Sequence, residues 1–130
     1  MPDQGKRILV VEDDTAYRKA LVKKFLSEGF NVQEAEDGEK GLASALQEHP
    51  DLILMDVIMP KVDGLTMTRR LREDEWGKNA RILYLTSLES DEKIMNQLLE
   101  NRPAYYLIKT AWTLDDIVDR VRSLLDTNIE

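Results

Sequence analysis

Five polar or charged side chains stand at the ends of short apolar runs in this sequence. They are, in chain order, Glu12, Asp13, Asp56, Thr86 and Lys109. An apolar run bounded by turn residues is typical of a buried strand, and charged groups that end such strands lie where open α/β sheets bind their ligands. We therefore expect carboxylates, a hydroxyl and an ammonium to meet at one edge of a sheet.

The carboxylates in this set predict a magnesium site. Like charges in one crevice raise each other's pKa or attract a cation, and a site of oxygen ligands with few protein contributions suits Mg²⁺, which keeps several of its waters. A carboxylate beside Mg²⁺ can accept a phosphoryl group when nearby groups neutralise the phosphoryl oxygens. We expect Asp56 to attack in line while Lys109 neutralises the developing charge.

Five stretches are predicted to be the strands that position these side chains. They cover residues 8–11, 30–35, 52–55, 81–86 and 104–108. The first and third consist of branched or long apolar residues, as in strands buried on both faces of a parallel sheet, whereas the second alternates and suits an edge strand. Between and after the strands, apolar residues recur at helical spacing over residues 17–26, 39–49, 65–71, 94–99 and 114–125.

The alternation of strands and helices predicts an α/β fold. We expect a doubly wound, five-stranded parallel sheet in the order 2-1-3-4-5 with five helices, a flavodoxin-like three-layer sandwich. The first and third strands are neighbours in that order, so Glu12 and Asp13 should meet Asp56. No linker or repeat interrupts the pattern, so residues 1–130 are expected to form a single domain, either complete or cut from a longer chain.

The composition excludes several classes of protein. The chain has no cysteine, which rules out a disulfide framework and thiolate metal sites. Its net charge of −7 argues against direct binding of this chain to nucleic acid or to an anionic membrane. No apolar run has the length of a signal-peptide core or a membrane span, so a cytoplasmic location is expected.

These motifs resemble the receiver domains of bacterial two-component response regulators over nearly the whole chain. The matching segments are ILVVEDD at residues 8–14, LMDVIMP at residues 54–60 with Asp63-Gly64, Thr86-Ser87, and Tyr106 three residues before Lys109. All stand in the family's order and spacing.

The resemblance implies a role for each matching residue. Asp56 would be the phosphoacceptor, taking its phosphoryl group from a phosphohistidine on a sensor histidine kinase or phosphotransfer protein. Asp13 and Asp56 would bind Mg²⁺, Glu12 would hold a metal-bound water, and the main-chain carbonyl of Ile58 would complete the protein ligands. Thr86 and Lys109 would contact phosphoryl oxygens.

The resemblance also implies a conformational switch. Thr86 would move toward the phosphoryl group and let the Tyr106 ring turn inward, which would reshape the face formed by the fourth helix, fifth strand and fifth helix. A downstream protein or output domain would bind that face. Formation of a phosphorylation-linked homodimer is a further possibility under this resemblance. Such a switch promotes its own phosphorylation and dephosphorylation without being a multiple-turnover enzyme.

Two other function classes stay open because of particular residues. A Mg²⁺-dependent phosphohydrolase that forms an aspartyl phosphate usually carries a second aspartate two residues after its nucleophile, where this chain has Ile58, so turnover should be poor. Lys109 precedes Thr110, where the family usually has a proline after a cis bond. This departure keeps open a degenerate receiver that binds partners without being phosphorylated.

Overall fold

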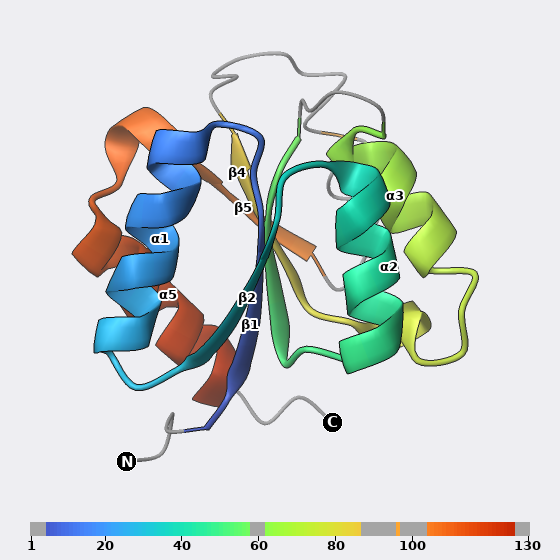
Figure 1. Ribbon diagram of the computed structural model, residues 1–130, viewed down its shortest axis with the longest axis horizontal. Helices are drawn as coiled ribbons and strands as arrows, with labels where there is room; N and C mark the ends of the chain where they lie inside the picture. Colours follow the sequence, from blue (N-terminus) through green and yellow to red (C-terminus); the bar gives the residue numbers. More distant parts are fainter. Residues whose placement is uncertain (1–4, 58–61, 87–95, 97–103, 127–130) are drawn as a thin grey trace.

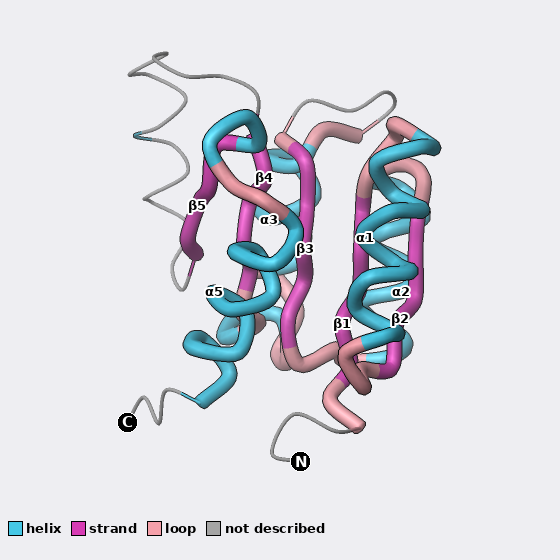
Figure 2. The backbone as a smooth tube through the Cα atoms, turned by 90° about the vertical axis from the view of Figure 1, so that its left-hand side faces the viewer, coloured by secondary structure: helices cyan, strands magenta, loops and turns pink. Residues whose placement is uncertain are grey.

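A five-stranded parallel sheet forms the centre of the protein, seen in a computed structural model that describes residues 5–57, 62–86, 96 and 104–126. Its strands are β1 (Arg7–Val11), β2 (Asn31–Ala35), β3 (Leu52–Asp56), β4 (Ile82–Thr86) and β5 (Ala104–Ile108). The order β2-β1-β3-β4-β5 can be followed across Figure 2 and confirms the predicted topology. The predicted boundaries agree with the observed ones to within one residue at each end.

Helices cover both faces of the sheet and make the three-layer sandwich. The described α-helices are α1 (Thr15–Ser27), α2 (Gly38–Glu48), α3 (Gly64–Leu71) and α5 (Leu114–Asp126). Figure 1 shows α1 and α5 on one face and α2 and α3 on the other. The helix predicted around residues 94–99 lies outside the described residues except for Asn96, which is helical.

Two apolar cores separate along the sheet because successive strand residues point to opposite faces. Leu9, Ile53 and Tyr84 belong to the core under α2 and α3. Val10 and Leu54 belong to the core under α1 and α5. The central strands are thus fixed from both sides, which holds their carboxyl ends in a defined geometry.

Side-chain caps begin α1, α3 and α5, as expected where unpaired N–H groups need acceptors. Asp14 is the N-cap of α1 and accepts a hydrogen bond from the Tyr17 N–H at 3.2 Å. Thr113 and Asp116 form a reciprocal capping box at the start of α5. Asp63 is the N-cap of α3 and accepts a hydrogen bond from the Thr66 N–H at 2.8 Å.

The described helices are short and polar on one face. None of them is long and apolar enough to cross a membrane.

Candidate functional site

The carboxyl ends of β1 and β3 bring three acidic side chains together, as the strand order predicts. Ligand oxygens of Glu12, Asp13 and Asp56 all lie within 4.8 Å of one another. Glu12 and Asp13 directly follow β1, and Asp56 is the last residue of the neighbouring β3. We call these three residues the acidic cluster.

Glu12 is fixed at both its backbone and its side chain. Its N–H donates to the carbonyl of Ala35 at 3.0 Å, and its carbonyl accepts from Arg18 Nη1 at 2.9 Å. Its side chain is 2% exposed, and Oε2 accepts from the N–H of Asp14 at 3.1 Å. A carboxylate held this way points in one direction, which suits a ligand better than a surface charge.

Lys109 joins the acidic cluster from the end of β5. Its Nζ donates to Glu12 Oε1 at 2.6 Å and to Asp56 Oδ2 at 3.3 Å. The lysine side chain is 18% exposed. It begins a short 3₁₀ turn, Lys109–Ala111, that links β5 to the segment before α5. The structure therefore unites four of the five side chains singled out in the sequence around one point.

Burial, hydrogen bonding and charge shift the pKa values of Glu12 and Lys109 at this site. Burial raises the pKa of Glu12 to about 7, the hydrogen bond from Lys109 opposes the rise, and the charge of Asp56 adds to it. Burial alone would lower the pKa of Lys109, but its hydrogen bond to Glu12 and the charge of Asp56 outweigh burial and raise it. The lysine therefore stays charged, whereas Glu12 changes its protonation state near neutral pH.

This pKa rise predicts how Mg²⁺ stabilises the protein at different pH values. A carboxyl whose pKa rises from 4.5 to about 7 on folding contributes stability below pH 4.5 that is lost as the pH rises through 7. Mg²⁺ needs the ionised form, so its stabilising effect should grow over that range. In thermal unfolding, we expect the Tm increase caused by millimolar Mg²⁺ to be small at pH 5 and largest near pH 8.

Glu12→Gln is the control for this pH dependence, because it removes the titrating group while keeping its size. The variant should show a smaller and flatter Mg²⁺ effect. An equal Mg²⁺-induced shift in Tm at pH 5 and pH 8 in the unmodified protein would contradict the role given to Glu12.

Gly64 supports the segment that carries Asp56 through close backbone contact. A Cβ atom at this position would lie 2.5 Å from the carbonyl oxygen of Asp56 and 3.1 Å from the Cα of Val57. The Gly64 N–H also donates to the Val57 carbonyl at 2.8 Å. The first turn of α3 therefore packs directly against the backbone that carries Asp56.

Gly64→Ala should displace Asp56 and slow its phosphorylation about tenfold, because small displacements of a reacting group are costly. We expect this result in an acetyl phosphate labelling assay. Gly77→Ala is the matched control, since its Cβ would lie 2.0 Å from the Leu71 carbonyl, away from the acidic cluster. The control should lose stability but keep its labelling rate, and equal slowing in both variants would show a general effect of backbone strain.

The remaining predicted residues lie near the same edge or outside the described part of the chain. Thr86 is buried at the end of β4, one residue beyond the pair Asp56 and Leu85. Tyr106 lies on β5 beside Tyr84 and is 36% exposed. Ile58, whose carbonyl was predicted to be a metal ligand, lies outside the described residues.

Two contacts of this site were missed in the sequence. Arg18 is buried and links the Glu12 carbonyl to Glu34 of β2, with Nε 2.8 Å from Glu34 Oε1. Tyr17 of α1 lies under Lys109, with Nζ 4.8 Å from the ring centroid. Both residues adjoin the apolar stripe of α1, but nothing in that periodicity indicates which strand end they contact.

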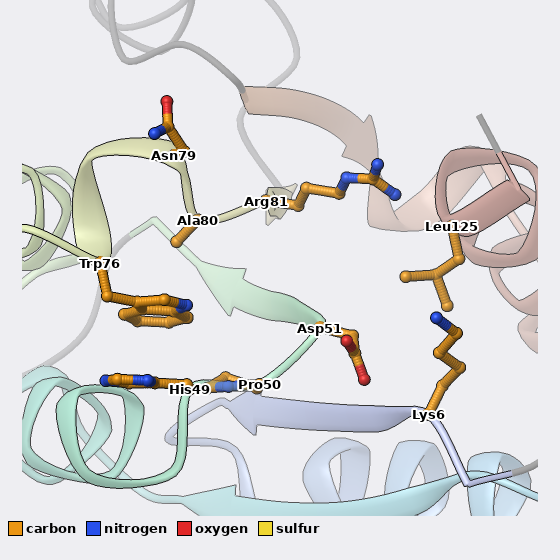
Figure 3. A pocket seen from close by; sticks show the side chains of 9 residues that line it. All are labelled: Lys6, His49, Pro50, Asp51, Trp76, Asn79, Ala80, Arg81 and Leu125. Carbon is orange, nitrogen blue, oxygen red and sulfur yellow. The ribbon is translucent and has the colours of Figure 1, made fainter. Parts of the chain in front are cut away.

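A pocket lies at the opposite end of the strands from the acidic cluster. Figure 3 shows this pocket of about 310 Å³, where Lys6, Asp51 and Arg81 stand just before strands. The rings of His49 and Trp76 form one wall, stacked with centroids 4.4 Å apart. No residue of the acidic cluster lines this pocket. The magnesium site and phosphoryl transfer predicted from the sequence are therefore assigned to the carboxyl ends of the strands.

Comparison with known proteins gives matches over nearly the whole chain. The model of the response regulator receiver domain matches residues 8–122. The DNA-binding dual master transcriptional regulator RpaA of Synechocystis sp. is 40% identical over 92% of this chain and 48% of that protein. Response regulator MprA of Mycolicibacterium vanbaalenii is 37% identical over 92% of this chain and 50% of that protein. The chain thus spans about half the length of these relatives.

A solved structure gives a similar result for the fold. The receiver domain of the sensor histidine kinase PA1611 from Pseudomonas aeruginosa, which holds a magnesium ion in its active-site cleft, aligns with a TM-score of 0.85. It is 28% identical, and the match covers 95% of this chain and 99% of that one.

Proposed function

Because this chain belongs to the family of response regulator receiver domains, we propose that it is a phosphorylation-dependent signalling switch whose phosphoacceptor is Asp56. The observation that carries the proposal is the position of Lys109, whose ammonium bonds to both Glu12 and Asp56. A carboxylate between a fixed cation and further carboxylates suits nucleophilic attack on a phosphoryl group.

The acidic cluster fits a magnesium ion. Its three oxygen donors are hard ligands, Glu12 is oriented by hydrogen bonds, and Asp13 is exposed at the solvent side. We assign Asp13 and Asp56 as ligands and Glu12 as the holder of a metal-bound water, with the Ile58 carbonyl as a further ligand. When bound, Mg²⁺ neutralises charge on the phosphoryl oxygens.

The protein's own groups perform the transfer. An Asp56 carboxylate oxygen attacks the phosphorus of a phosphohistidine and forms an acyl O–P bond. As the P–N bond breaks, its electron pair stays on the imidazole nitrogen, which takes a proton from solvent water. Lys109 neutralises a phosphoryl oxygen, and the Thr86 hydroxyl donates to another. Hydrolysis of the acyl phosphate resets the switch, so the protein promotes its own phosphorylation and dephosphorylation without being a multiple-turnover enzyme.

Residues on β4 and β5 pass the effect of phosphorylation to the protein surface. Thr86 and Tyr106 are the switch residues, and Tyr106 starts from an exposed position, from which its ring would turn inward on phosphorylation. The reading face comprises β5, α5 and the helix predicted between β4 and β5. We propose a sensor histidine kinase or phosphotransfer protein as donor, a downstream protein or output domain as receiver of the signal, and the cytoplasm as the location.

A labelling experiment with acetyl phosphate and Mg²⁺ tests this function. The proposal expects one phosphoryl group per chain, dependence on Mg²⁺ and slow loss after the donor is removed. Rapid release of many equivalents of phosphate would instead support the phosphohydrolase class. Absence of label in the folded, Mg²⁺-loaded protein would support a degenerate receiver.

A further inference from the structure

The ring of Tyr17 supplies a contact to Lys109 that the functional assignment does not use. Tyr17 lies in the first turn of α1, where its N–H is anchored to the capping side chain of Asp14 at 3.2 Å. The ammonium of Lys109 stands 4.8 Å from the centroid of the ring. This separation lies within the range of a cation–π interaction, which is strongest where water is excluded.

The surroundings of Tyr17 indicate that its ring, rather than its hydroxyl, is the part that interacts with Lys109. The hydroxyl oxygen is buried and has no hydrogen-bond partner among the described residues. The ring is partly buried against the core under α1 and α5. Burial raises the pKa of the phenol, so Tyr17 stays neutral and its ring face stays attractive to a cation.

We propose that Tyr17 is a positioning residue for phosphoryl transfer, whose ring face holds the Lys109 ammonium beside Asp56. The inference rests on the proposed function and adds a specific residue to it. Lysine is a flexible point charge, and its side chain has many rotamers to lose. Two carboxylates attract the ammonium in the absence of a cation, but Mg²⁺ competes for the same oxygens. The neutral ring gives the ammonium a contact that a metal ion does not take.

The test compares Tyr17→Phe with Tyr17→Leu in the full chain. Phenylalanine keeps the ring face and removes only the unpartnered hydroxyl, so it should label with acetyl phosphate at the unmodified rate. Leucine keeps apolar packing but removes the ring, so its labelling rate should fall about tenfold. Similar Mg²⁺ affinities in both variants, measured by calorimetry, would show that the acidic cluster is intact. Equal labelling rates in the two variants would overturn the proposal.

A double-mutant cycle separates positioning from a merely structural role. In a Lys109→Met background, Tyr17→Leu should cause no further slowing, because the contact it removes is already gone. Continued slowing in that background would mean that Tyr17 acts through the fold, and it would overturn the inference. The ε-methylene proton signals of Lys109 provide a second readout, since the ring current should shift them in the Phe variant and not in the Leu variant.

The outcomes for the unmodified protein keep the two proposals distinct. If the unmodified protein accepts no label on Asp56, the proposed function fails. If it labels normally and Tyr17→Leu labels equally fast, the positioning role fails and the proposed function stands.

Discussion

Asp56→Asn is expected to abolish labelling by acetyl phosphate, lowering it at least about a hundredfold relative to the unmodified protein. The amide has nearly the same shape as the carboxylate but lacks the anionic oxygen that attacks phosphorus. The fold should persist because Asp56 is at a strand end, outside both apolar cores. Intact-protein mass spectrometry at neutral pH measures the phosphorylated fraction directly.

The loss should come with a change at Glu12. The charge of Asp56 contributes to the raised pKa of Glu12, so the amide variant should ionise Glu12 at lower pH. Asp14→Asn is the matched control, since it makes the same chemical change nearby at a residue whose capping role asparagine can keep. The control should label normally, and persistent labelling of Asp56→Asn would mean that another residue accepts the phosphoryl group.

Lys109→Met should slow labelling about a hundredfold without weakening Mg²⁺ binding. The ammonium neutralises transferred charge, so its loss removes transition-state stabilisation. It also competes with a cation for oxygens of Glu12 and Asp56, at 2.6 Å and 3.3 Å. Its removal should therefore leave Mg²⁺ affinity unchanged or make it tighter, as calorimetry can measure.

Lys109→Arg separates the effect of the positive charge at this position from the effect of the shape of the side chain. Arginine keeps the positive charge but spreads it over a planar fork that fits the site differently, so we expect partial activity between the methionine variant and the unmodified protein. If Lys109→Met loses Mg²⁺ binding together with labelling, the lysine would be holding the acidic cluster in place rather than acting on the phosphoryl group.

Much of the fold follows from local sequence pattern. The apolar runs and their turn residues predicted all five strands, and the connection rules for parallel sheets then predicted their order. Small differences have local causes. Phe30 was expected in β2, but it precedes the strand and packs edge-on against Phe25, with ring centroids 5.3 Å apart.

The acidic cluster was predictable for the same reason, because strand order alone decides which strand ends are neighbours. The contacts of Arg18, Tyr17 and Gly64 were not, since they depend on how α1 and α3 pack on the sheet. Tyr17 fits the apolar stripe of α1 equally well as a simple core residue. Its approach to Lys109, which is distant in sequence, becomes visible only when the helix and the end of β5 are placed in space.

Chemical trapping of the phosphorylated residue tests the central claim most directly. Borohydride reduces an acyl phosphate to the corresponding alcohol, so a phosphorylated aspartate becomes homoserine, which peptide mass spectrometry can locate. After incubation with Mg²⁺ and acetyl phosphate, we predict homoserine at position 56 and unmodified aspartate at positions 13 and 14. Homoserine at another position, or labelled protein with no trapped residue at position 56, would contradict the account.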